Sequence, residues 1–151
     1  MFPFIIRFSK TIDKSINSDQ SNIILDNIQE LLKDKGADYF SKENDKLIFE
    51  NKLFKLVSNW NLMAYTDAGF VELKKTENNT IKIIYDVKHI SIWIISLIFT
   101  MIIFLSTKDV TSSLIAFSFL GILTWLISIL RHWRFIYIMT EKIIDLIDND
   151  K

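Results

Sequence analysis

Two histidines, His89 and His132, are the residues best placed in this sequence for metal or haem chemistry. Each stands at the edge of an uncharged apolar run, and pairing of the two runs as an antiparallel hairpin brings both imidazoles to the same end. Two ligands at a water boundary, with no third donor, make a poor metal or haem site. We therefore expect no metal and no cofactor, and we interpret both histidines as interfacial side chains that hydrogen-bond lipid headgroups or backbone.

Carboxylates are the next candidates for chemistry, as a general acid and base. Glu50, Asp67, Glu72 and Asp86 all lie in the predicted sheet region, but nothing in their spacing selects a pair. The chain has no cysteine, which excludes thiolate nucleophiles and thiolate metal sites. Its 18 basic and 18 acidic residues balance, without the basic excess expected of a nucleic-acid-binding protein. We predict a non-enzymatic protein with no catalytic residue and no nucleic-acid partner.

Two uncharged apolar runs, at 90–105 and 114–130, predict a pair of transmembrane helices. With their polar flanks they extend to about 89–107 and 112–132, close to the roughly 20 residues that a bilayer needs. Half of all residues are hydrophobic, as expected of a membrane protein. The alternative, two helices buried in a soluble core, would normally show a charged stripe facing water, and these runs carry none.

The short connection at 106–113 predicts that the two spans form a tight antiparallel hairpin within residues 89–134. Its single basic residue is Lys108, whereas Lys82, Lys88, Arg131, Arg134 and Lys142 flank the opposite ends. The positive-inside rule then places both termini in the cytoplasm. Frequent Ile, Asn and Lys are typical of an AT-rich bacterial genome, so we expect a multi-pass protein of the bacterial inner membrane. The predicted membrane-interface residues are Lys88, His89, Trp93, Trp125, Arg131, His132, Trp133 and Arg134.

Small residues predict where the two spans pack, because close approach of helices in lipid depends on them. Gly121, Thr124 and Ser128 fall within an arc of about 60° on the second span, at 100° per residue. Ser96 and Thr100 lie one turn apart on the first span. We expect these faces to meet; the alternative is that one of them binds another subunit. Neither apolar run, 90–105 or 114–130, contains an ionisable residue, which argues against an ion pathway or a proton relay.

Residues 1–88 predict a small cytoplasmic α/β domain with the order β-α-β-β-β-β, which makes the whole chain an α+β membrane protein. Strands are expected at 4–9, about 38–41, 46–50, 70–76 and 80–87, the last two joined by a turn at 77–79. A helix is expected from a cap at 17–19 to a stop at Gly36. The pattern of segment 52–69 does not select one structure. Residues 53–57 fit a short helix or a strand, and the side chains at 60–65 either cap the core or lie on the membrane surface.

The C-terminal region, residues 135–151, is predicted to be a cytoplasmic helical extension of the second span. No proline interrupts residues 114–147, and Ile136, Met139, Ile143 and Ile147 continue one apolar face. One helix of about 34 residues would be about 50 Å long and would pack on the sheet or bind a partner. The alternative is a break near 131–134, followed by an amphipathic helix lying flat on the membrane.

The chain combines two predicted membrane spans with no recognisable catalytic, metal-binding or nucleotide-binding motif. This combination predicts a non-enzymatic subunit or adaptor of a bacterial inner-membrane complex. Its expected partners are membrane lipids and either other membrane-protein subunits or further copies of itself, bound through the spans or the cytoplasmic domain. The alternative is a membrane-bound ligand sensor or toxin-like effector, whose cytoplasmic domain controls the helical hairpin.

Overall fold

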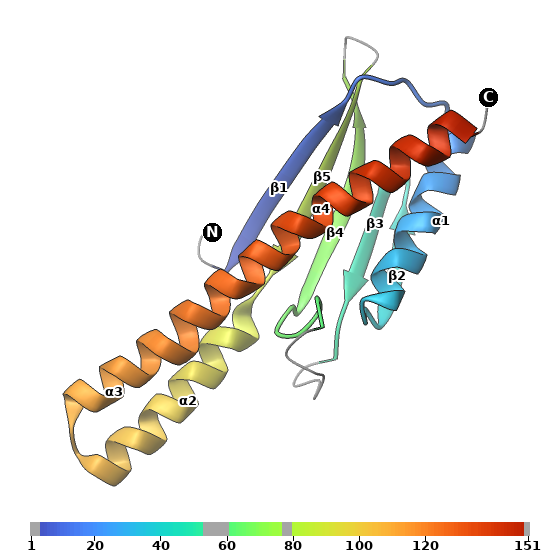
Figure 1. The fold of residues 1–151 in the computed structure, drawn as a ribbon. Helices are drawn as coiled ribbons and strands as arrows, with labels where there is room; N and C mark the ends of the chain where they lie inside the picture. The colour runs from blue at the N-terminus through green and yellow to red at the C-terminus, as the bar shows by residue number, and fades with distance from the viewer. Residues whose placement is uncertain (1–3, 53–60, 77–79, 150–151) are drawn as a thin grey trace.

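The computed structural model describes residues 4–52, 61–76 and 80–149 and shows an α+β fold (Figure 1). Its described strands form one antiparallel sheet in the order β1-β5-β4-β3-β2. The predicted order β-α-β-β-β-β is confirmed. The strands are β1 (Ile5–Ile12), β2 (Tyr39–Glu43), β3 (Lys46–Glu50), β4 (Ala68–Lys75) and β5 (Ile81–Lys88).

Strands β1, β2 and β4 are longer than predicted, because their pairing continues past the predicted ends; β4 begins at Ala68 instead of residue 70. β1 pairs with β5 as far as Ile12 opposite Ile81, and the buried Ile12 continues the inward alternation of the strand. β2 reaches Glu43, so only residues 44 and 45 separate it from β3, instead of the four residues between the predicted strands 38–41 and 46–50. Asn44 has a φ of 52° there, a left-handed conformation that asparagine tolerates well in tight hairpins. The predicted turn at 77–79 lies outside the described residues.

Helix α1 (Ser18–Asp34) begins and ends as the sequence predicts. The Asn17 side chain accepts a hydrogen bond from the Gln20 N–H at 2.7 Å, and the Gln20 side chain accepts one from the Asn17 N–H at 3.2 Å. This reciprocal pair satisfies donors at the helix start that would otherwise lack partners. After the helix, Gly36 adopts a φ of 93°, and Ala37 N–H donates to the Leu32 carbonyl.

The second apolar helix is continuous from Val110 to Asn149, 40 residues or about 60 Å. It consists of α3 (Val110–Phe117), a π-helical segment η1 (Ser118–Leu123) and α4 (Thr124–Asn149). The prediction of one long helix is confirmed, and the helix is longer than expected. The predicted alternative, a break near 131–134, is not found. Its C-terminal half crosses the sheet beside α1 (Figure 1).

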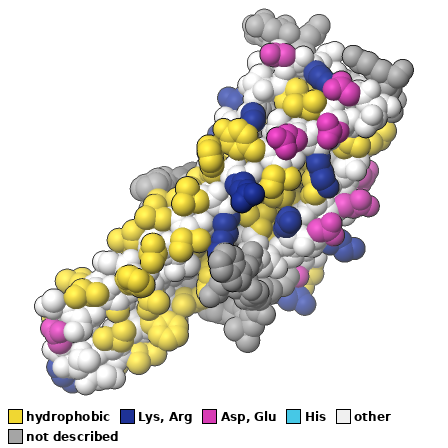
Figure 2. All heavy atoms as spheres, in the orientation of Figure 1, with side chains coloured by type: hydrophobic (Ala, Val, Ile, Leu, Met, Phe, Trp, Pro, Cys, Tyr) yellow, Lys and Arg dark blue, Asp and Glu magenta, His cyan; other side chains and the backbone are white. Residues whose placement is uncertain are grey.

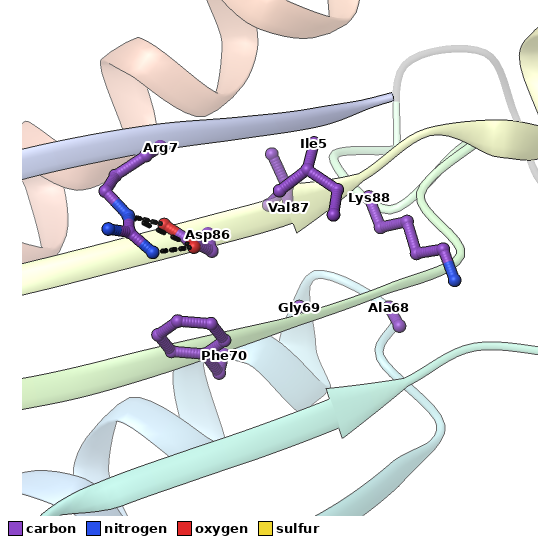
Figure 3. A pocket seen from close by; sticks show the side chains of 8 residues that line it. All are labelled: Ile5, Arg7, Ala68, Gly69, Phe70, Asp86, Val87 and Lys88. Carbon is purple, nitrogen blue, oxygen red and sulfur yellow. Dashed lines mark hydrogen bonds and ion pairs between the residues drawn. The ribbon is translucent and has the colours of Figure 1, made fainter. Parts of the chain in front are cut away.

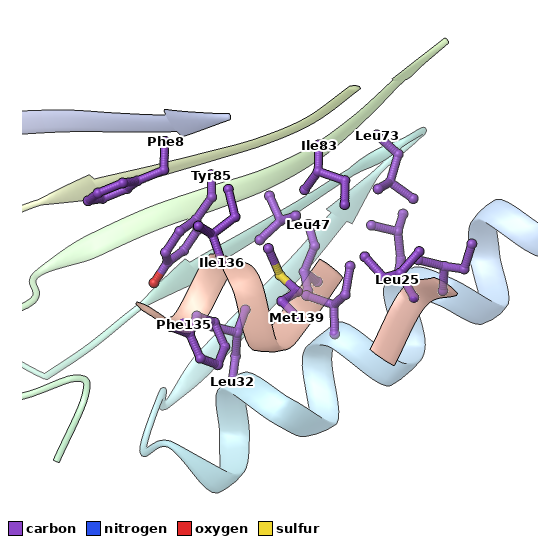
Figure 4. Close-up of a cluster of buried hydrophobic side chains, with 14 of the residues drawn as sticks. Phe8, Leu25, Leu32, Leu47, Leu73, Ile83, Tyr85, Phe135, Ile136 and Met139 are labelled. Atoms are coloured by element: carbon purple, nitrogen blue, oxygen red, sulfur yellow. The ribbon is translucent and has the colours of Figure 1, made fainter. Parts of the chain in front are cut away.

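The hydrophobic core lies between one face of the sheet and the two helices α1 and α4 (Figure 4). Inward side chains of alternate strand positions meet the apolar stripe of α1 and the extended face of α4. Leu62 and Met63, from the segment that the sequence left open, also belong to this core, whereas residues 53–60 lie outside the described part. The labelled members are Phe8, Leu25, Leu32, Leu47, Leu73, Ile83, Tyr85, Phe135, Ile136 and Met139.

Helix α2 (Ile90–Thr107) follows β5 after a single residue and forms a hairpin with α3. The loop is only two residues long, not 106–113 as predicted, because Lys108 adopts a left-handed φ of 56° that ends α2. The Asp109 carboxylate then accepts the N–H groups of Thr111 and Ser112 at 3.0 Å each, and hydrogen bonds from Ser112 lower the pKa of that carboxyl group. Both apolar helices are long and apolar enough to cross a membrane.

Candidate functional site

The junction between the sheet and the hairpin is held by Asp67. Its carboxylate accepts the backbone N–H groups of Ile90 and Ser91 at 2.5 and 3.0 Å, which satisfies two donors in the first turn of α2. The Asp67 N–H donates to the Lys88 carbonyl at 2.8 Å, and the His89 N–H donates to the Phe4 carbonyl at 2.8 Å. The helix therefore leaves the sheet in a direction fixed by hydrogen bonds on both sides of the connection.

The two histidines meet inside this junction. Both side chains are fully buried, and their ring centroids are 5.3 Å apart. His132 Nδ1 lies 2.6 Å from the Tyr85 hydroxyl, and its Nε2 lies 2.9 Å from Thr66 Oγ1. Burial raises the pKa of Tyr85 well above its ordinary value, so the phenol keeps its proton. Both ring nitrogens of His132 thus have a hydroxyl group as hydrogen-bond partner.

This pair is a structural polar junction rather than a set of metal ligands. His89 Nδ1 lies 3.2 Å from the Tyr65 carbonyl, so three of the four ring nitrogens of the pair already have partners within the chain. In the described part of the chain no three His, Asp or Glu side chains are grouped to hold a metal ion. The sequence predicted that both histidines hydrogen-bond lipid headgroups or backbone. His89 faces the Tyr65 carbonyl, whereas His132 hydrogen-bonds the Tyr85 and Thr66 side chains, and the location of both at a membrane interface stays a prediction.

A groove of about 610 Å³ lies at the opposite face of the sheet, away from α1 and α4 (Figure 3). It occupies the end of the sheet next to the hairpin, since Lys88 in its wall is followed by His89 and the start of α2. Its walls are largely apolar, with charges from β1 and β5. The lining residues are Ile5, Arg7, Ala68, Gly69, Phe70, Asp86, Val87 and Lys88.

Arg7 and Asp86 form the polar edge of this groove through a two-pronged ion pair. Arg7 Nε lies 2.8 Å from Asp86 Oδ1, and Nη2 lies 2.7 Å from Oδ2. The Arg7 side chain is 64% exposed and that of Asp86 only 7%. Hydrogen bonding and the charge of Asp86 raise the pKa of Arg7. The guanidinium thus stays charged at the rim, with its carboxylate partner beneath it.

Sequence reasoning missed this pair because the two residues are 79 positions apart. Arg7 and Asp86 each stand on the polar side of an alternating strand, which is the signal that was available. Only the register of β1 against β5, with Arg7 directly opposite Asp86, brings them together. Of the other carboxylates singled out, Asp67 caps α2, Glu72 stands opposite Lys46 and Ile84 in the sheet, and Glu50 is exposed at the last position of β3.

Of the small residues predicted to pack the two spans, Gly121 and Ser96 meet within the hairpin. A Cβ on Gly121 would lie 3.3 Å from Ser96 Oγ, so the two helix backbones approach closely there. Ser96 Oγ donates to the Ile92 carbonyl at 2.7 Å, and Thr100 Oγ1 donates to the Ser96 carbonyl at 2.7 Å. Ser96, Gly121 and Ser128 are buried, and Thr100 and Thr124 are half-buried.

The remaining interface candidates differ in exposure. Trp125 is buried and its ring centroid lies 6.1 Å from that of Trp93, which is half-buried. Trp133 is exposed and makes an edge contact with Tyr137. Of the basic residues, Lys88 and Arg134 are exposed and Arg131 is half-buried.

The outer surface of the hairpin is apolar, whereas charged side chains gather on the sheet domain and at the hairpin tip (Figure 2). Leu97, Met101 and Leu105 on α2 are 54–61% exposed, and Leu114, Phe119 and Leu130 on the second helix are 61–68% exposed. Exposed apolar surface of this extent marks a membrane or a protein interface. No protein-family model, curated protein or solved structure matches the chain.

Proposed function

We propose that this protein is a non-enzymatic, membrane-anchored adaptor of the bacterial inner membrane. The apolar surface of the hairpin carries the proposal. Only 17% of the span window in α2 and 22% of that in the second helix are buried, whereas a core helix of a soluble protein is mostly buried. Insertion into a bilayer removes this surface from water without requiring another protein.

Dimensions and charge support an orientation with the sheet domain in the cytoplasm. The 18 residues of α2 are about 27 Å long, close to the hydrocarbon thickness of a bilayer. Lys88, Arg131 and Arg134 gather at the base of the hairpin, while its tip carries Lys108 beside Asp109. Basic residues are retained on the cytoplasmic side.

The sheet face opposite α1 and α4 is the surface that we propose for a protein partner. Ile5, Ile48, Phe70 and Ile84 project from neighbouring strands on this face and are half-buried. Arg7–Asp86 and the Lys46 Nζ, 3.9 Å from the Phe70 ring centroid, place charges around them. An apolar centre with a polar rim is the usual composition of a protein interface. The short connection to α2 holds this face beside the membrane.

Purification of the tagged protein in mild detergent, with the particle mass determined, tests the adaptor function. We expect a particle with other chains in fixed ratio, which Phe70→Ser on the uncovered face disrupts. Ile23→Ser on α1, where Ile23 is 50% exposed, should leave the particle intact. A lone monomer or homo-oligomer from the native membrane would contradict the adaptor function.

The groove favours a second candidate function, a membrane-bound ligand sensor. A volume of about 610 Å³ suits a small molecule, and Lys88 in its wall is one residue from the start of α2. Native mass spectrometry of the purified protein would then show a retained small molecule, which Ala68→Trp should displace by filling the groove. If the native protein had the same mass as the denatured protein, no small molecule would be retained, which would contradict this function.

A further inference from the structure

Three polar side-chain atoms at the base of the hairpin are buried without a hydrogen-bond partner among the described residues. They are Nε2 of His89, Nε1 of Trp93 and Oγ of Ser128. His89 is 0% exposed and Ser128 5%. Buried polar groups in folded proteins nearly always have a partner, so three orphans in one region call for a common explanation.

The geometry of the hairpin brings these three residues to one place. His89 immediately precedes α2, and Trp93 lies in the first turn of that helix. Ser128 lies between Trp125 and His132 on α4. The ring contacts His89–His132, at 5.3 Å, and Trp93–Trp125, at 6.1 Å, therefore bracket Ser128 from both sides.

The hydrogen-bonding character of the three groups selects the ligand. His89 Nδ1 faces the Tyr65 carbonyl at 3.2 Å, and a carbonyl can only accept, so Nδ1 carries the proton and Nε2 is an acceptor. The indole of Trp93 can only donate, and the Ser128 hydroxyl can do either. The mixed set disfavours a cation, which the indole N–H would repel, and an anion, which the Nε2 lone pair would repel.

We propose that His89, Trp93 and Ser128 bind one buried water molecule. It donates one hydrogen bond to His89 Nε2 and one to Ser128 Oγ, and it accepts one from Trp93 Nε1–H. Three hydrogen bonds to otherwise unpartnered buried groups are typical of internal water. The water joins α2 to α4 where the sheet ends, and it completes the polar junction around His132.

Indole N–H resonances of the full-length protein in detergent test the site directly. The chain has four tryptophans, and Trp93→Phe identifies the resonance of Trp93. We expect a cross-peak from this N–H to a long-lived water proton, and Ser128→Ala should weaken it and shift the indole resonance. Ser96→Ala is the matched control, because the buried Ser96 hydroxyl already donates to the Ile92 carbonyl. An indole N–H without a water cross-peak, unchanged by Ser128→Ala, would overturn the site.

A double-mutant cycle provides a second readout that does not require the resonance. Once Ser128→Ala has removed one ligand of the water, Trp93→Phe should lower the melting temperature by less than it does in the parent protein. The pair Ser106→Ala and Trp93→Phe should be additive, because Ser106 lies more than three turns further along α2 and its hydroxyl donates to the Ile102 carbonyl. Additive losses for both pairs would contradict a shared water molecule.

Discussion

The sheet domain and the hairpin contain the same kinds of apolar side chain but place them oppositely. Leu25 and Leu47 in the sheet domain are 0% exposed, whereas Leu97 and Leu114 in the hairpin are 54% and 61% exposed. The long helix contains both arrangements, since Met139 on α4 is fully buried against the sheet. The same helix therefore packs its apolar side chains into the core of the sheet domain at one end and exposes them on the surface of the hairpin at the other.

The largest expected difference between the two regions comes from truncating a leucine in each. Leu47→Ala leaves a cavity in the core and should lower the free energy of unfolding by about 2–5 kcal/mol. Leu97→Ala removes an exposed side chain and should change it by less than about 0.5 kcal/mol. Chemical denaturation in detergent measures both. Similar losses at the two sites would show that Leu97 is packed against protein.

A charge at a half-exposed position should be costly in the hairpin and tolerated on the sheet domain. Ile98→Asp lies at the middle of α2 and should cost about 3 kcal/mol of membrane insertion. Ile23→Asp on α1 is the matched control, because Ile98 and Ile23 are 49% and 50% exposed. Fractionation of membranes after alkaline washing measures the inserted share. Equal retention of both variants would contradict insertion of α2.

Glycine replacement compares the closeness of packing in the two regions. A Cβ on Gly69 would lie 2.2 Å from the Asp86 carbonyl oxygen and 2.5 Å from the Phe49 ring, so Gly69→Ala should lower stability by about 1–3 kcal/mol or more. A Cβ on Gly121 would lie 3.3 Å from the Ser96 hydroxyl, and Gly121→Ala should cost less than about 1 kcal/mol. Thermal unfolding ranks the two variants. A larger loss at Gly121 would show that the hairpin packs more tightly than the sheet.

The smallest expected effect concerns the caps at the two ends of the hairpin. Asp67→Ala removes acceptors from α2 at the half-buried junction and should cost about 1–2 kcal/mol. Asp109→Ala removes the corresponding cap at the exposed tip and should cost less, since water replaces the carboxylate there. Hydrogen exchange of the first turns of α2 and α3 measures the local loss. An equal increase in hydrogen exchange in the first turns of α2 and α3 would contradict the predicted difference between the two caps.

Periodicity and caps were sufficient to predict the elements of the fold. Helix α1 carries a repeating apolar face, a capping box at Asn17 and a glycine stop, each of which depends on residues close in sequence. The long helix likewise followed from an apolar face without a proline. Boundaries of β1 and β2 were missed because polar residues such as Lys42 and Thr11 extend these strands through pairing, which local pattern does not specify.

The candidate sites depended on contacts that the sequence could only suggest. The proximity of His89 and His132 followed from the hairpin, but their enclosure required Tyr65 and Thr66 from a segment of ambiguous pattern. Arg7 meets Asp86 through strand register alone. The groove is a property of the uncovered sheet face, and no single segment of sequence encodes it.

Cysteine accessibility tests the central claim, that the hairpin crosses a membrane with the sheet domain on the cytoplasmic side. The chain contains no cysteine, so Lys108→Cys at the tip and Lys142→Cys on the exposed side of α4 each introduce one thiol. In intact bacterial spheroplasts, a membrane-impermeant maleimide should label the cysteine at 108 and leave that at 142 unlabelled until the cells are lysed. Equal labelling of both positions before lysis, or labelling of neither before lysis and both after it, would contradict the proposed topology.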